Sequence, residues 1–160
     1  MRREDRDGIL VYGSYGKPLL VFPAERGNRY EWENTGMIGA LAWLLSHWTY
    51  PGRLSGLLLQ SGSFFRRRLD PQESAAARFA RITRFVSRVF GGRGAIDRIP
   101  VTLTCGTGEE NLGNNRAVAD ALRRQGWQAT LVEHPDAHNW VSWRDSLHPH
   151  LAELLLRAAE

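Results

Sequence analysis

The sequence predicts an α/β fold, a mostly parallel sheet with helices on both faces, from two observations. From Met37 onward, stretches with helical spacing alternate with short apolar runs, and this alternation is typical of parallel strands joined by crossover helices. Leu57-Leu58-Leu59 is one such run, and a continuous apolar run is typical of a strand covered on both faces. The length fits a single domain over residues 1–160, with N-terminal strands and a loop over residues 8–35 and the alternating part over residues 36–160.

The N-terminal part is predicted to form a hairpin at one edge of the sheet. Ile9 to Tyr12 is a short run of β-forming residues, and the glycines of residues 13–16 indicate a turn after it. Residues 19–22 form a second apolar run, which Pro23 ends.

The alternating part is predicted to contain four helices and three strands. In chain order these are a helix over residues 37–48, a strand over 57–59, a helix over 73–90, a strand over 100–105, a helix over 112–125, a strand over 127–133 and a helix over 139–158. Pro51-Gly52 and Gly91-Gly92 end the first two helices, Gly126 caps the third, and Pro149 restarts the last one.

Two of these helices have a clear apolar face. In the helix over residues 112–125, we expect Val118, Ala121 and Leu122 to point inward. In the helix over residues 73–90, one side at helical spacing carries Phe79, Ile82, Phe85, Val86, Val89 and Phe90. Arginines occupy the opposite side of that helix.

The composition narrows the class of protein. The formal net charge is +4, but the arginines lack interleaved aromatic residues, so we do not expect a nucleic-acid partner. Cys105 is the single cysteine, which excludes an internal disulfide and suits a reducing, cytoplasmic location. The charged N-terminus precedes only a short apolar stretch, so neither a secretory signal nor a membrane span is expected. The histidines lack metal-binding spacing, and no phosphate loop or dinucleotide motif is present, so we expect no metal and no cofactor.

Three loops, over residues 60–63, 106–111 and 134–139, follow the carboxyl ends of predicted strands. In parallel sheets, binding and catalytic sites lie beyond these strand ends. Glu109 and Glu110 follow one strand and a glycine pair, and His138 follows the next strand. Parallel neighbours can bring an acid beside a histidine, and the carboxylate then fixes the imidazole tautomer and raises its basicity. An acid and then a histidine after successive strands matches the chain order of α/β hydrolases.

Each of these residues also has a purely structural interpretation. Glu109 and Glu110 carry negative charge at the start of a helix, where the helix dipole favours it. Asn111 suits the N-cap of the same helix, and His138 suits a helix-entry position that bonds to backbone.

Several segments carry a resemblance to a known family. They are Cys105-Gly-Thr-Gly-Glu-Glu-Asn-Leu with Asn114-Asn115-Arg116, His138-Asn139-Trp140 with Trp143-Arg144-Asp145, YPGRLSGLLLQSGSFF at residues 50–65, and GKPLLVFPAERG at residues 16–27. They resemble an esterase family of the α/β hydrolases that includes esterase D-like, enterochelin esterase-like and mycolyltransferase-like enzymes. The resemblance implies a shortened α/β-hydrolase-like fold, with His138 as general base and Glu110 or Glu109 as the acid that orients it. Ala137 stands where the family often has glycine.

The family's nucleophile is a serine on a Gly-x-Ser-x-Gly elbow between a strand and a helix, and this sequence lacks that motif. Two residues before Ser14, where the motif requires glycine, the sequence has Tyr12. Residues 35–40, at the start of the first predicted helix, contain no serine. Family members are much longer at this point, so the chain resembles a member with its middle removed. Ser61, at the end of the strand that faces the site, is the best substitute nucleophile, and turn or capping duty is the alternative.

The sequence therefore predicts a carboxylic ester hydrolase that acts on a small-molecule ester. The missing elbow serine also removes part of the oxyanion hole, which predicts weak activity or none. The alternative is a non-catalytic remnant of an esterase that binds a ligand or another chain. A homodimer is one form of this alternative, because a sheet without its central strands exposes edges and apolar surface.

Overall fold

The computed structural model describes residues 3–6, 9–12, 28, 30, 56–66, 70–71, 77, 80–92 and 98–157. The chain divides into two compact units, Met1–Leu54 and Ser55–Glu160, and each is described by itself. The predicted helix over residues 37–48 and the predicted strand over residues 19–22 lie outside the described residues. The single-domain organisation therefore stays a prediction.

The first unit contains an antiparallel strand pair. Strand β1 (Arg3–Arg6) pairs with strand β2 (Ile9–Tyr12), with Arg3 opposite Tyr12 and Arg6 opposite Ile9. The strand predicted at Ile9–Tyr12 is confirmed. Its observed partner is the charged segment β1, which was not predicted as a strand because it contains no apolar residue.

The second unit is built on a three-stranded parallel sheet in the order β3-β4-β5. The strands are β3 (Leu57–Gln60), β4 (Val101–Gly106) and β5 (Ala129–His134). Leu57 pairs with Val101, and Val101 pairs with Ala129. This confirms the predicted parallel sheet, and each strand lies within two residues of its predicted bounds.

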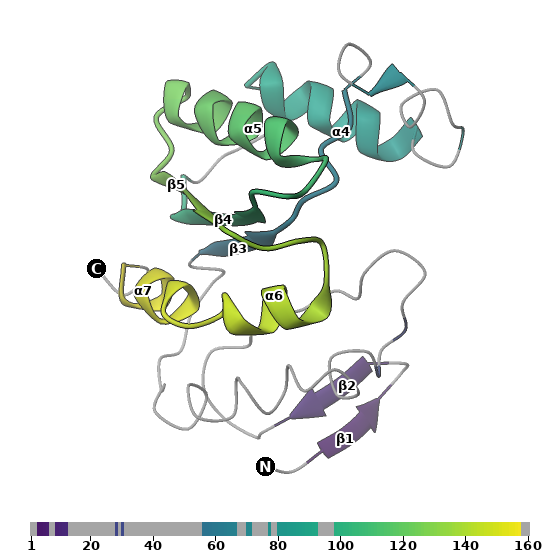
Figure 1. Ribbon diagram of the computed structural model, residues 1–160, viewed down its shortest axis with the longest axis vertical. Coiled ribbons are helices and arrows are strands. Elements are labelled where there is room, and N and C mark those ends of the chain that lie inside the picture. The colour runs from purple at the N-terminus through teal and green to yellow at the C-terminus, as the bar shows by residue number, and fades with distance from the viewer. Residues whose placement is uncertain are drawn as a thin grey trace. The chain divides into compact units, whose positions relative to one another are not determined.

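Helices cover both faces of this sheet, as predicted (Figure 1). Helix α5 (Leu112–Arg124) packs on β4 and β5, and helix α4 (Ala80–Phe90) packs beside α5. Helix α7 (His150–Arg157) packs on β3 and β4 from the other side. Helix α6 (Trp140–Asp145) precedes α7. The helical stretch expected over residues 139–158 is thus two short helices, and the second begins directly after Pro149, where the sequence predicted a restart.

The apolar core lies between the sheet and helix α5. Val101, Leu103 and Ala129 of the strands pack with Val118 and Leu122 of the helix, and Leu103 is fully buried. This is the face that the apolar spacing of residues 112–125 predicted. On α4, Val86 is buried, but Phe85 is 56% exposed, so the predicted apolar stripe is narrower than expected.

The opposite face of the sheet is more polar. Side chains alternate along a strand, so Thr102 faces away from the α5 side, and Arg157 of α7 donates to its hydroxyl at 2.7 Å. Arg157 also donates to Thr130 on β5 at 3.1 Å. Gln60, at the end of β3, donates to the carbonyl of Trp143 at 2.7 Å and to Ser146 at 2.9 Å. The Gln60 bonds hold α6 at the carboxyl end of the sheet, where the candidate site lies, whereas the Arg157 bonds hold α7 at the amino half.

Among the described residues, none of the helices has both the length and the apolar character needed to span a bilayer.

Candidate active site

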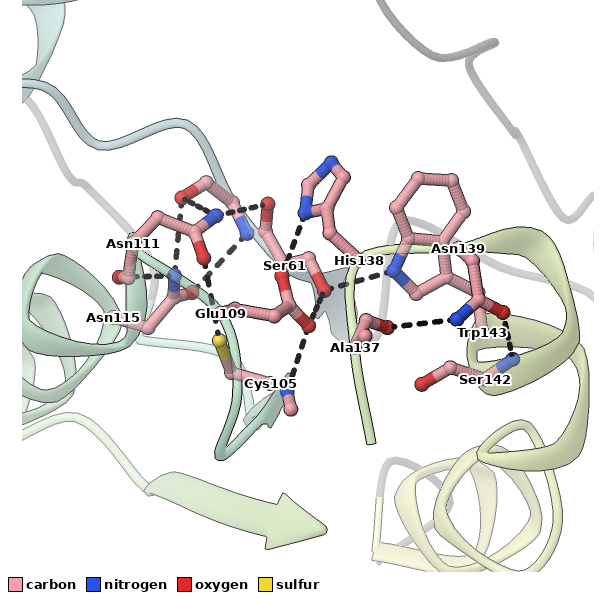
Figure 2. A network of polar contacts seen from close by, with 12 residues as sticks. Ser61, Cys105, Glu109, Asn111, Asn115, Ala137, His138, Asn139, Ser142 and Trp143 are labelled. Atoms are coloured by element: carbon pink, nitrogen blue, oxygen red, sulfur yellow. Dashed lines mark hydrogen bonds and ion pairs between the residues drawn. The ribbon is translucent and has the colours of Figure 1, made fainter. Parts of the chain in front are cut away.

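Residues from three segments meet beyond the carboxyl ends of the parallel strands. Ser61 directly follows β3, Glu109 lies in the turn between β4 and α5, and His138 lies in the loop between β5 and α6 (Figure 2). Strand ends meet at one edge of a parallel sheet, which is why residues 48 and 29 positions from a partner come into contact.

The central contact joins Glu109 to His138. Glu109 Oε2 lies 2.6 Å from His138 Nδ1, the distance of a short charge-assisted hydrogen bond. The Glu109 side chain is fully buried, whereas the His138 side chain is 53% exposed. The second ring nitrogen, Nε2, points away from Glu109 (Figure 2). The acid is therefore held inside the protein, and the imidazole presents its free nitrogen outward.

The second carboxylate oxygen of Glu109 is held by two donors. The Ser61 hydroxyl donates to Oε1 at 2.7 Å, and the Gly106 amide donates to the same atom at 2.7 Å. Burial by itself raises the pKa of Glu109, but the hydrogen bonds from Ser61, Gly106 and His138 outweigh it and lower the pKa. Glu109 is therefore an ionised carboxylate at neutral pH, despite its burial.

Ser61 adopts a backbone conformation that is rare for serine. Its φ is 48°, in the left-handed region, which costs roughly 1–3 kcal/mol for a residue other than glycine. Backbone bonds hold it there: its amide donates to the Thr104 carbonyl at 2.8 Å, and Asn111 Nδ2 donates to its carbonyl at 2.9 Å. The side chain is buried, and its hydroxyl also accepts a hydrogen bond from Trp143 Nε1 at 2.8 Å.

Trp143 of α6 contacts the histidine as well as the serine. Its ring centroid lies 4.8 Å from that of His138 in an edge-to-face arrangement, and Trp140 packs edge-to-face against Trp143 at the same centroid distance, 4.8 Å. The Trp143 indole N–H has a specific polar partner 82 positions away, which no local pattern could have indicated.

Two asparagines of the turn and helix after β4 hold the loop after β3. Asn115 is fully buried, accepts from the Gly62 amide at 3.1 Å and donates to the Gly62 carbonyl at 3.1 Å. Asn111 is the N-cap residue of α5, yet its side chain makes no capping bond and bonds to Ser61 instead. Asn111 therefore occupies the predicted N-cap position, but its side chain does not cap the helix. Asparagine at both positions was visible in the sequence, but its partners were not.

Gly106 allows the turn after β4 to approach the loop after β5. A Cβ atom at this position would lie 2.3 Å from the Asp136 carbonyl oxygen and 3.0 Å from Glu109 Oε1. Any side chain here would therefore push apart the two loops that carry the acid and the histidine.

Cys105 is buried below the site and is not part of its polar edge. Burial is the main reason that the pKa of its thiol rises to about 12, and the neighbouring charge of Glu109 adds to the effect. Its sulfur lies 3.6 Å from Asn111 Oδ1. The thiol therefore remains protonated at neutral pH, which makes it a poor nucleophile and a poor metal ligand.

The structure brings together three of the four residues singled out in the sequence. Glu109, His138 and Ser61 are joined by hydrogen bonds, whereas Glu110 has an exposed side chain. The described residues contain no cluster of His, Cys, Asp or Glu that could hold a metal ion.

The fold is similar to that of a known esterase. A ferulic acid esterase aligns with a TM-score of 0.50 and 17% sequence identity, over 77% of this chain and 47% of that one. An S-formylglutathione hydrolase (FrmB) from Staphylococcus aureus aligns with a TM-score of 0.41 and 13% identity, over 75% of this chain and 46% of that one. The chain thus spans about half the length of these proteins.

No protein-family model matches the sequence, and no curated protein is similar to it. At such identities the structural likeness shows the fold alone. It supports the shortened α/β-hydrolase-like fold that the sequence predicts.

Proposed function

We propose that this chain hydrolyses small carboxylic esters, with His138 as the general base and Glu109 as the acid that orients it. The observation that carries the proposal is the 2.6 Å contact between a buried, ionised Glu109 and Nδ1 of a half-exposed His138. A carboxylate at Nδ1 keeps a proton on that atom, so Nε2 carries the lone pair that can accept a proton.

The proposed reaction uses water as the attacking group. His138 Nε2 takes a proton from water while the oxygen attacks the ester carbonyl, and the resulting tetrahedral species expels the alkoxide. The imidazolium then returns its proton to the departing alkoxide, which leaves a carboxylic acid and an alcohol. Glu109 remains ionised throughout and stabilises the imidazolium.

We propose water as the attacking group because the proton of the Ser61 hydroxyl is already donated to Glu109. The hydroxyl donates to Glu109 and accepts from Trp143, so it is not oriented to give its proton to an imidazole nitrogen. Without a nucleophilic serine, we expect activity several orders of magnitude below that of complete serine esterases.

Hydrolysis of p-nitrophenyl acetate by three variants tests the proposal. His138→Ala is expected to lower the catalysed rate by about 10²–10⁴-fold, and Glu109→Gln to lower it nearly as far. Glu110→Gln is the matched control, because it makes the same chemical change one residue away on an exposed side chain. A rate that is unaffected by His138→Ala would refute the proposal.

A second experiment identifies the attacking group. A fluorophosphonate forms a stable adduct with an activated serine, and intact mass with peptide mapping locates it. Water as the attacking group predicts no adduct on folded protein. A stoichiometric adduct that His138→Ala abolishes would establish serine catalysis, with Ser61 as the first residue to inspect.

The alternative is a non-catalytic module that binds a ligand or a second copy of the chain. Exposed apolar side chains favour it, since Phe85, Val141 and Leu156 are 56%, 56% and 63% exposed. Hydrolysis that is independent of His138, together with a dimer mass in sedimentation equilibrium, would support this alternative.

A further inference from the structure

The hydroxyl of Ser61 connects the acid to the tryptophan that packs on the histidine. A serine hydroxyl has one proton to donate and can accept hydrogen bonds, whereas an indole N–H can only donate. The Trp143 contact therefore uses the hydroxyl as an acceptor, and the single proton of Ser61 goes to Glu109. The direction of both hydrogen bonds follows from the identity of the three groups.

This directed chain determines which way the carboxylate faces. Glu109 Oε1 accepts from the Ser61 hydroxyl and from the Gly106 amide, both at 2.7 Å. Rotation of the carboxylate would break both bonds, so Oε2 stays aimed at His138 Nδ1. The arrangement orients the acid without contacting the outward nitrogen of the imidazole.

Trp143 contacts His138, the partner of Glu109 in the acid–histidine pair. Its indole donates to Ser61 at 2.8 Å, and the same ring packs edge-to-face against His138 with an interplanar angle of 87°. The ring thus has a hydrogen-bonded edge that holds it in place and a surface that limits movement of the imidazole (Figure 2).

The backbone of Ser61 shows that the side chain matters at this position. With φ at 48°, the local conformation suits glycine better than any other residue. The residue is nevertheless a serine and is only 4% exposed. Its hydroxyl donates one hydrogen bond to Glu109 and accepts one from Trp143.

From these contacts we infer that Ser61 and Trp143 are positioning residues, which hold Glu109 and His138 in the geometry needed for proton transfer. The inference rests on the proposed function for its catalytic meaning. It assigns Ser61 a role in orienting the acid and not in attacking the ester. The titratable groups facing Glu109 are His138 and Cys105, and the latter stays protonated.

Ser61→Gly is the informative variant, because glycine tolerates the observed φ and removes only the hydroxymethyl group. The expected result is a kcat about ten- to a hundredfold lower with KM changed less than about twofold, since positioning acts on the chemical step. Ser61→Ala should match it in kcat. Ser63→Ala, on an exposed serine two residues away, is the control and should leave both constants unchanged.

A titration provides a readout that is independent of hydrolysis. Carbon-13 NMR of the Glu109 carboxyl carbon is expected to show its midpoint moving to higher pH in Ser61→Gly, because a donor to the ionised form is lost. Trp143→Phe, which keeps an aromatic ring but removes the indole N–H, should move the midpoint in the same direction by a smaller amount. Ser63→Ala should not move it.

The outcomes separate this inference from the proposed function. If neither His138→Ala nor Glu109→Gln lowers the rate of hydrolysis, the proposed function fails. A raised titration midpoint of Glu109 in Ser61→Gly would still establish that Ser61 orients the carboxylate. An unchanged midpoint in folded Ser61→Gly overturns the inference, whatever the activity. A fluorophosphonate adduct on Ser61 also overturns it, because the hydroxyl would then be the nucleophile.

Discussion

At the scale of a single residue, Glu109 makes the stability of the folded chain depend on pH. Its pKa in the folded chain is lowered below the ordinary value of 4.5, because the hydrogen bonds of Ser61, Gly106 and His138 outweigh the effect of burial. A lowered folded pKa contributes stability that is present above the unfolded value and is lost as the pH falls through the folded value. The wild type should therefore lose stability on acidification in part through this residue.

Glu109→Gln is predicted to remove that contribution. The difference in free energy of unfolding between wild type and variant should narrow as the pH falls below 4.5. Urea unfolding from neutral pH to about pH 3 measures the difference. Glu110→Gln serves as the reference, and an identical acid response in both variants would contradict the assignment of Glu109 as the buried acid.

Cys105 should be unreactive while the chain is folded. It is fully buried, and its pKa of about 12 compares with an ordinary value of 9.0, so its thiolate population is lower by roughly three orders of magnitude. Labelling with iodoacetamide at mildly alkaline pH should be at least about a thousandfold slower in buffer than in denaturant. Fast labelling of folded protein would show that the strand end is open to solvent.

At the scale of elements, the close approach of two loops builds the site, and Gly106 permits it. Gly106→Ala would place a Cβ atom 2.3 Å from the Asp136 carbonyl, so we predict a loss of about 1–3 kcal/mol of stability. Gly113→Ala is the matched control: a Cβ there meets nothing within 4 Å, and alanine in α5 should add up to about 1 kcal/mol. The free energy of unfolding measured with urea should fall for Gly106→Ala and rise for Gly113→Ala. Equal effects of the two substitutions would contradict the predicted clash.

The elements of the second unit were predictable because local patterns specify them. Apolar runs indicated β3, β4 and β5, and the spacing of Val118, Ala121 and Leu122 indicated the buried face of α5. Strand β1 was not predicted, since its residues are all charged and only pairing with β2 makes it a strand. The Asp7-Gly8 dipeptide between these strands is a hairpin signal that could have revealed it.

The candidate site was predictable only in part for the same reason. Glu109 and His138 follow successive strands, so the rule for parallel sheets brings them together without knowledge of side-chain contacts. The choice of Glu109 over Glu110, and the roles of Ser61 and Trp143, depend on side-chain directions set by tertiary packing. Spacing along the chain contains no information on those directions.

At the scale of the whole molecule, the network that forms the site lies within one of the two units. Ser61, Glu109, His138 and Trp143 all belong to Ser55–Glu160, as does the apolar cluster around Leu103. A unit with its own core and its own polar network has what independent folding requires.

We therefore predict that a fragment spanning residues 55–160 folds by itself and retains the pair of Glu109 and His138. Its Glu109 carboxyl titration should match that of the full chain, because the groups that lower the pKa are all present in it. Leu103→Ala should cost about 2–5 kcal/mol in both, since the same buried leucine is removed. A fragment that is unfolded, or whose Glu109 titrates at the ordinary value, would mean that residues 1–54 help to hold the site together, and the site would then belong to the whole chain.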